Sequence, residues 1–220
     1  DDAGVARDTV VLFMSDNGGI GSIPGNNAPL RAAKLTVYEG GVRVPAAVWW
    51  PGVIEGGRKI AAPIVNIDLM PTLLRACGAP AAAPAGPLDG VDVLDVLTGR
   101  QQATPDRDLY FFNGQNGLER EQIAVTTPDG WKLVVVGPDI RADAGFQTPQ
   151  HRVELFHLAK DPLEQTDLAA QEPERVKALG VKLIAFRRSE PAQSLAPINR
   201  KPPTFQAPQN WRNAPIAHAP

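Results

Sequence analysis

The sequence predicts an α/β protein: a portion of a mixed or parallel sheet domain, followed by a small α+β subdomain. In the first half, short apolar runs and helical patterns alternate between turn-rich segments, as in α/β sheets. From about residue 105, four short strand patterns precede a single helical pattern, which is the order of an α+β unit. We therefore divide the chain into residues 1–104, residues 105–190 and a Pro-rich irregular tail, residues 191–220.

The composition narrows the class of protein. The chain has 220 residues, of which 43% are hydrophobic and 21% charged, which fits a soluble globular protein with a real core. Its net charge of −2 gives no basic footprint for nucleic acid. No apolar run approaches the ~18 residues that a membrane span requires. The single cysteine, Cys77, excludes an internal disulfide.

The apolar run at residues 10–14 stops abruptly at a turn. We predict a strand over 9–14, buried on both faces as in a parallel sheet. Asp16 and Asn17 follow it, and then two glycines, so oxygen ligands lie just past the carboxyl end of the strand, where α/β sheets bind ligands. A carboxylate beside an amide oxygen suits calcium or magnesium. The pattern alone is equally compatible with a plain turn.

The remaining elements of the first part are short. We expect a helical turn over 29–34, strands over 44–50 and 62–67, and a helix over 91–97.

A further helix is predicted to begin after Asp68 as its N-cap. Pro71 lies in its first turn and Gly78 at its end, which are typical helix start and stop signals. Cys77, near the end of this helix, is expected to be a buried and inert thiol.

The second part has the pattern of an antiparallel sheet and one helix. Four strands are predicted over 109–112, 122–127, 131–136 and 153–158, with a tight hairpin turn at 128–130. The helix begins near Pro173. Its apolar residues are spaced by three, four and three, which places them on one face, and they are Val176, Leu179, Leu183 and Phe186. Gly180 should weaken it, and Arg187 and Arg188 suit its C-terminal end.

Several motifs in this order resemble one family. They are SDNGG, NNAPLRAAK, YEGGVRVPAAVWWPG, NIDLMPTLL and LDGVD, and later DGWKLV, ELFHL and DPLE. Over about residues 1–190 they are similar to the C-terminal part of arylsulfatase-type sulfatases, in the alkaline phosphatase superfamily. The resemblance implies the C-terminal portion of an alkaline-phosphatase-like sheet domain in a calcium-dependent sulfuric ester hydrolase, periplasmic or secreted. Its partner would be a sulfated small molecule or glycan.

The resemblance also implies roles for individual residues. Asp16 and Asn17 fall on two of the family's metal ligands, usually for calcium, and Lys34 falls on the catalytic lysine that contacts the substrate sulfate. Lys34 follows Asp16 by 18 residues, which fits the family's spacing. Without these neighbouring motifs, Lys34 would be interpreted as a solvated surface lysine.

Other residues of the same motifs are expected to be structural. Glu39 and Arg43 of EGGVR can pair, and the glycines between them allow close backbone approach. Asn26 and Asn27 are expected to shape the loop. The family often has glycine after Pro-Leu-Arg, where this chain has Ala32. If that position needs a positive φ, alanine would be strained there.

The family's nucleophile is not found in the sequence. Sulfatases use a formylglycine made from the first residue of a Cys/Ser-x-Pro-x-Arg motif, and Cys77 is followed by Ala79 and Ala81 at the two diagnostic positions. We expect the nucleophile and the other metal ligands upstream, in a chain cut inside a domain. The isolated chain should therefore be inactive. Two alternatives stay open: a phosphate or phosphonate ester hydrolase of the superfamily, or a non-catalytic sulfatase-like module that binds sulfated glycan.

Overall fold

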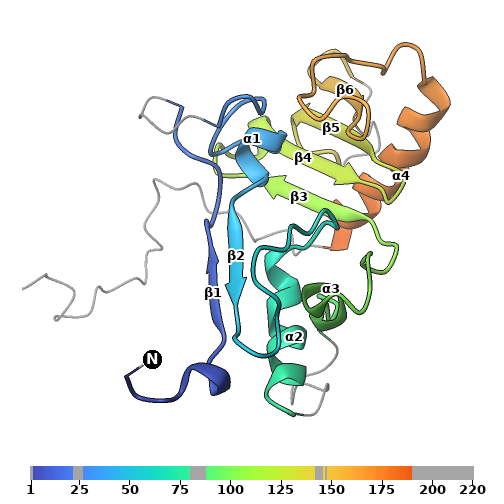
Figure 1. Cartoon of the computed structure of the whole chain (residues 1–220). Coiled ribbons are helices and arrows are strands. Elements are labelled where there is room, and N and C mark those ends of the chain that lie inside the picture. The colour runs from blue at the N-terminus through green and yellow to red at the C-terminus, as the bar shows by residue number, and fades with distance from the viewer. Residues whose placement is uncertain (1, 22–26, 80–87, 142–145, 147, 190–220) are drawn as a thin grey trace, which may run out of the picture. The chain divides into compact units, whose positions relative to one another are not determined.

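A computed structural model describes residues 2–21, 27–79, 88–141, 146 and 148–189 (Figure 1). The chain forms two compact units. The first contains the described residues of 1–109, 126–131 and 157–165, and the second those of 110–125, 132–156 and 166–220. The expected tail at 191–220 lies outside the described residues.

The first unit begins with a 3-10 turn, η1 (Ala6–Asp8), and a two-stranded sheet. Strand β1 (Val11–Met14) pairs antiparallel with β2 (Ala46–Trp49) (Figure 1), and Val11 lies opposite Trp49. Both strands were predicted. The prediction that the first strand is buried on both faces, as in a parallel sheet, was wrong. Phe13 is 65% exposed. A run of apolar residues reports how hydrophobic a strand is, and it carries no information about the direction of its partner.

The main helix of this unit is α2 (Leu69–Ala76), preceded by a 3-10 turn, η2 (Asn66–Asp68). The predicted helix is confirmed, with Pro71 in its first turn and Gly78 at φ +69° just beyond its end. Cys77 is exposed, so the prediction of a buried thiol was wrong. It lies at the C-cap, where the helix end faces solvent instead of the core.

A second short helix, α3 (Leu94–Thr98), ends at Gly99 with φ +83°. The strand predicted over 62–67 does not form. Its Ala62 and Ile64 pack instead against the apolar cluster of Val93, Val96 and Leu97. Pro63 lies inside the run and has no N–H to donate to a sheet ladder, which explains why these apolar residues pack without pairing.

The helical turn predicted over 29–34 is made of non-helical turns and bends. The helical turn of this region is α1 (Glu39–Val42), which coincides with the EGGV motif. Helix propensity did not predict this helix, because it contains two adjacent glycines and glycine is a poor helix former.

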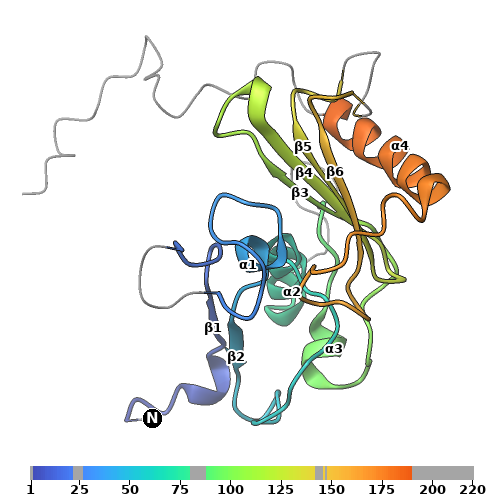
Figure 2. The ribbon, with the colours of Figure 1, turned by 90° about the horizontal axis from the view of Figure 1, so that it is seen from above.

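The second unit is built on the predicted four-stranded antiparallel sheet, and its strand order is β3-β4-β5-β6. The strands are β3 (Leu109–Asn113), β4 (Glu121–Thr126), β5 (Trp131–Gly137) and β6 (Arg152–His157), and a 3-10 turn, η3 (Leu118–Arg120), precedes β4. Helix α4 (Pro173–Ser189) lies along one face of this sheet (Figure 2). The hairpin turn and the end of β6 belong to the first unit.

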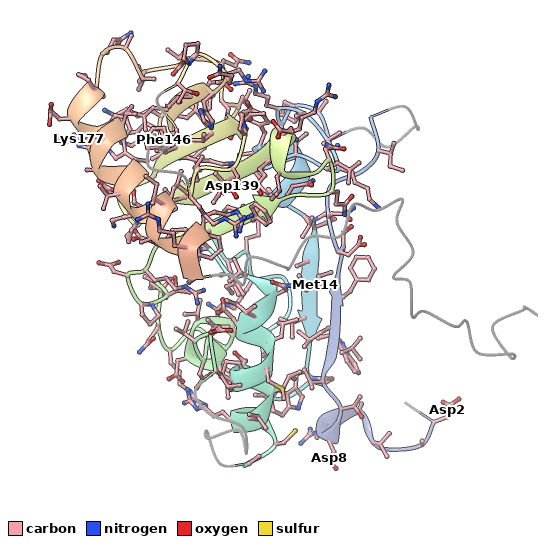
Figure 3. The ribbon with its side chains drawn as sticks, turned by 180° about the vertical axis from the view of Figure 1, so that it is seen from behind. Asp2, Asp8, Met14, Asp139, Phe146 and Lys177 are labelled. Carbon is pink, nitrogen blue, oxygen red and sulfur yellow. The ribbon has the colours of Figure 1, made fainter. Side chains whose placement is uncertain are left out.

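Helix α4 buries the predicted face through Val176, Leu179 and Leu183. Phe146 lies against the helix (Figure 3), and a Cβ at position 180 would overlap its ring. Gly180 therefore provides room for a core aromatic residue, which offsets its poor helix propensity. Within the described residues, no helix is long and apolar enough to cross a bilayer.

Arg187 lies at the negative C-terminal end of α4, as predicted, and it also makes a buried ion pair. Its side chain is fully buried and makes a bidentate ion pair with Glu121, with a closest N–O distance of 2.6 Å. The guanidinium also lies over the ring of Phe112, 4.7 Å from the centroid. A charge-complementing role at the helix end could be predicted from the sequence, but the partner, 66 residues earlier, could not.

Candidate active site at the end of the first strand

The turn that follows β1 presents two oxygen-bearing side chains. We call residues 16–19 the DNGG turn. Asp16 is exposed, and its Oδ1 accepts the backbone N–H of Asn17 at 3.0 Å. The side-chain amide of Asn17 donates to the carbonyl of Gly18 at 2.9 Å. The nitrogen of that amide is therefore engaged by the backbone, and its oxygen is the atom suited to a ligand.

Lys34 is brought to this turn by the backbone. Its N–H donates to the carbonyl oxygen of Gly19 at 3.1 Å. The side chain of Asn27 strengthens the closure, because its oxygen accepts the Gly19 N–H at 2.7 Å and its nitrogen donates to the Gly19 carbonyl at 2.9 Å. We call residues 27–34 the lysine loop. The expectation that Asn27 shapes it is confirmed, and Asn26 lies outside the described residues.

Close glycine contacts join the DNGG turn to α1. The Gly18 N–H donates to the carbonyl of Gly41 at 2.9 Å, and a Cβ at Gly18 would overlap the carbonyl oxygen of Gly40. The Gly40 N–H in turn donates to the carbonyl of Arg31 at 2.7 Å. The predicted close approach is confirmed, and it makes the turn, the lysine loop and α1 one packed group of backbones.

Glu39 of α1 and Arg43, which follows the helix, also pair as expected. Nε of Arg43 donates to the carboxylate of Glu39 at 2.7 Å. Glu39 is buried, whereas the Arg43 side chain is half exposed. The pair therefore satisfies a buried carboxylate next to the DNGG turn.

Sequence reasoning missed the contribution of Glu164. Its buried carboxylate accepts the backbone N–H of Glu39 at 2.8 Å, and its carbonyl accepts from Nη1 of Arg31 at 3.0 Å. The DPLE motif marked this residue as part of the family pattern, but gave it no role. No local periodicity can connect Glu164 to Glu39, which lies 125 residues earlier.

One residue of the lysine loop and the residue directly after the loop have left-handed backbone conformations. Ala32 has φ +63° and Leu35 has φ +72°. The conditional expectation for Ala32 is therefore met: the position requires positive φ, and alanine is strained there. Strain next to a functional residue persists only where surrounding contacts enforce it, and here the Arg31 and Lys34 backbone hydrogen bonds lie on either side.

Replacing Ala32 with glycine should stabilise the chain. Relief of the left-handed strain outweighs the larger entropy of the unfolded glycine chain, for a net gain of about 0.5–1 kcal/mol. Urea unfolding of the 220-residue chain measures it. Ala33→Gly is the matched control, because Ala33 does not have positive φ. That variant should lose stability, and an equal response of both variants would contradict the argument.

The donors at this turn fit part of a calcium site. Within the described residues, no three His, Cys, Asp or Glu side chains gather as a possible metal cluster. Calcium takes six to eight oxygen ligands, so Asp16 and Asn17 could supply only part of its shell. The two side chains have the type of ligand atom that calcium prefers, but they are too few to complete its coordination shell.

Comparison of the chain with known proteins identifies its family. Residues 1–79 match the sulfatase family profile. Human arylsulfatase A is 34% identical over an alignment of 196 residues, and the match covers 81% of this chain and 38% of arylsulfatase A. The chain belongs to the sulfatase family. A sulfatase from Formosa agariphila is 32% identical over 77% of this chain and 30% of its own length.

Solved protein structures share the fold. The structure of Ps i-CgsB in complex with k-i-k-neocarrahexaose superposes with a TM-score of 0.64 and 26% identity. The match covers 84% of this sulfatase chain and 36% of Ps i-CgsB. The predicted α/β fold class is thereby confirmed. The chain spans about a third of the length of the relatives that it matches.

Proposed function

We propose that this sulfatase segment is the C-terminal part of a calcium-dependent sulfuric ester hydrolase and supplies one side of its active site. The observation that carries the proposal is the hydrogen bond from Lys34 to Gly19. It joins a lysine to a turn bearing two hard-oxygen donors, at the carboxyl end of a strand, where α/β folds bind ligands.

The chemistry of sulfate ester cleavage needs such a lysine. Negative charge builds on the oxygens of the transferred sulfuryl group and on the leaving oxygen, and a preorganised cation stabilises it. Within the described part of the chain, no hydrogen bond or ion pair occupies the ammonium of Lys34. Calcium, held in part by Asp16 and Asn17, would supply Lewis-acid stabilisation. The nucleophile, a formylglycine, would come from residues outside these 220.

The substrate class is a sulfated small molecule or glycan. The name arylsulfatase A supports a sulfate ester of a small aromatic alcohol. The oligosaccharide bound by Ps i-CgsB supports a glycan. In either class, the sulfate ester is the group that Lys34 would contact.

The test uses a longer polypeptide that contains these residues together with its upstream sequence. We expect it to hydrolyse a nitrophenyl sulfate in preference to the phosphate, and to lose activity when calcium is chelated. A preference for the phosphate would identify the related phosphoesterase chemistry instead. Binding of sulfated glycan with no turnover of either ester would favour the non-catalytic module.

The isolated 220-residue chain should neither hydrolyse sulfate esters nor bind calcium tightly. Two ligands rarely hold calcium, so we expect a dissociation constant weaker than about 0.1 mM by calorimetric titration. Asp16→Ala is the control for nonspecific binding. Micromolar affinity that Asp16→Ala removes, or clear turnover of an aryl sulfate, would contradict the assignment of the remaining ligands and nucleophile to other residues.

A further inference from the structure

We propose that Glu164 is a positioning residue for the lysine loop and the DNGG turn. It would act through α1 and Arg31, without touching substrate, and its catalytic consequence rests on the proposed function. The segment that carries it, residues 157–165, follows β6 along the chain but belongs to the first compact unit. The downstream half of the chain thus contributes a residue to the packing of the site.

Glu164 holds two neighbouring elements at once. Its carboxylate accepts the first N–H of α1, from Glu39, at 2.8 Å. That N–H has no partner inside its own helix, so the carboxylate satisfies a buried donor that would otherwise be costly. The carbonyl of Glu164 accepts from Arg31 of the lysine loop at 3.0 Å, and the Arg31 guanidinium also lies 4.3 Å from the centroid of the Tyr38 ring.

The backbone of Glu164 is held in an unusual conformation to make these contacts. Its φ is +55°, in the left-handed region that residues other than glycine seldom adopt. The side chain is 1% exposed, so the conformation is fixed by buried contacts rather than by a mobile surface turn. An unfavourable conformation that is enforced by its surroundings points to a role for the residue.

A continuous set of contacts leads from Glu164 to the site. Glu39 begins α1, and the next residue, Gly40, donates to the Arg31 carbonyl at 2.7 Å. Gly40 also packs directly under Gly18, the residue after Asn17. Because these backbones are in contact without intervening side chains, a shift of α1 must move the DNGG turn or the lysine loop.

Hydrogen exchange in the 220-residue chain tests the structural step without any activity. Glu164→Ala should accelerate exchange of the amides of Glu39, Gly40 and Gly18 by about 10-fold or more, because a buried hydrogen-bond acceptor is lost. Amides of the sheet in the second compact unit, such as those of Ile123 and Leu133, should keep their rates. Glu164→Gln retains an acceptor oxygen and should recover most of the protection.

Glu55→Ala is the matched control, since Glu55 is an exposed glutamate of the same unit. It should leave all of these rates unchanged. Equal acceleration of every amide in Glu164→Ala would mean that the residue only stabilises the fold, and no acceleration at Gly40 would mean that it holds nothing. Either result overturns the proposal.

A kinetic measurement on the longer enzyme tests the functional step. Glu164→Ala should lower kcat for a sulfate ester by about 10-fold, with a smaller change in KM, since misplacing a charge-stabilising group affects the transition state most. Glu164→Gln should restore kcat. An unchanged kcat in Glu164→Ala overturns positioning. Absence of sulfatase activity in the unsubstituted enzyme would instead refute the proposed function, while the exchange rates would still decide the structural role.

Discussion

Replacing Lys34 with alanine in the longer enzyme is expected to lower kcat for sulfate ester hydrolysis by about 10²–10³-fold. Removal of one preorganised group that stabilises transition-state charge typically has an effect of this size. The loss should fall on kcat more than on KM, because the charge on the sulfuryl and leaving oxygens is largest in the transition state. Steady-state kinetics with a nitrophenyl sulfate give both constants.

The matched control for that measurement is Lys59→Ala, which removes an exposed lysine of the same compact unit. Its kcat should stay within about twofold of the unsubstituted enzyme, because isolated surface charges contribute little. Lys34→Arg tests geometry at constant charge, and should recover only part of the rate, since the planar guanidinium is not equivalent to an ammonium point charge. If Lys34→Ala retained full kcat, Lys34 would have no role at the reacting sulfate.

The elements that the sequence could predict are those specified by neighbouring residues. Helix α4 is recognisable from the spacing of Val176, Leu179 and Leu183, and the four strands of the sheet from short apolar runs between turns. The residues of the candidate site could also be predicted from local sequence. Asp16, Asn17 and Lys34 lie in one stretch that contains two motifs of the family. Their catalytic and metal-binding roles stay predictions.

The elements that the sequence could not predict depend on distant partners. The antiparallel pairing of β1 with β2 joins residues far apart in sequence, such as Val11 with Trp49 and Met14 with Ala46. Glu164 and Arg187 are charged residues whose sequence neighbours favour a surface position, yet each is buried by a partner far along the chain. Long-range ion pairs and backbone contacts leave no periodic pattern in the sequence.

Asp68 is a third residue of this kind, and replacing it with asparagine is expected to reduce the free energy of unfolding by about 3–5 kcal/mol. The residue was predicted as an N-cap, but its carboxylate makes no capping bond to α2. It is fully buried and bidentate to Arg107, and its two oxygens also accept the N–H groups of Val65 at 2.9 Å and Val91 at 3.0 Å. Asparagine would place an NH₂ group against donors and leave Arg107 without its counter-charge.

The position of Asp68 explains why the loss should be large. The carboxylate links the start of α2 to residue 91, and the Asp68 carbonyl accepts the hydroxyl of Thr72 at 2.6 Å. That hydroxyl in turn accepts the N–H of Val93 at 3.0 Å. Loss of the carboxylate therefore loosens the contact between α2 and the segment leading to α3. Hydrogen exchange of the Val91 and Val93 amides at increasing urea concentrations would measure the stability of the first compact unit separately from that of the second.

The matched control is Asp106→Asn, an exposed aspartate beside the same arginine in sequence. It should change stability by less than about 0.5 kcal/mol. A double variant, Asp68→Asn with Arg107→Met, should recover part of the loss, because it no longer leaves a charge partly buried and unpaired. Equal stabilities of Asp68→Asn and Asp106→Asn would show that the ion pair does not hold α2 in place.

Acid should remove the same contribution in the unsubstituted chain. Burial acts to raise the pKa of Asp68, but hydrogen bonds from Arg107, Val65 and Val91 outweigh it and hold the pKa below its ordinary value. A lowered folded-state pKa means that the stabilisation is complete above the unfolded pKa of about 3.9 and is lost as the pH falls through the folded value. The stability difference between the unsubstituted chain and Asp68→Asn should therefore be constant from about pH 5 to 7 and narrow below about pH 4. A difference that persisted unchanged at pH 3 would place the origin of the effect in packing rather than in the charge of Asp68.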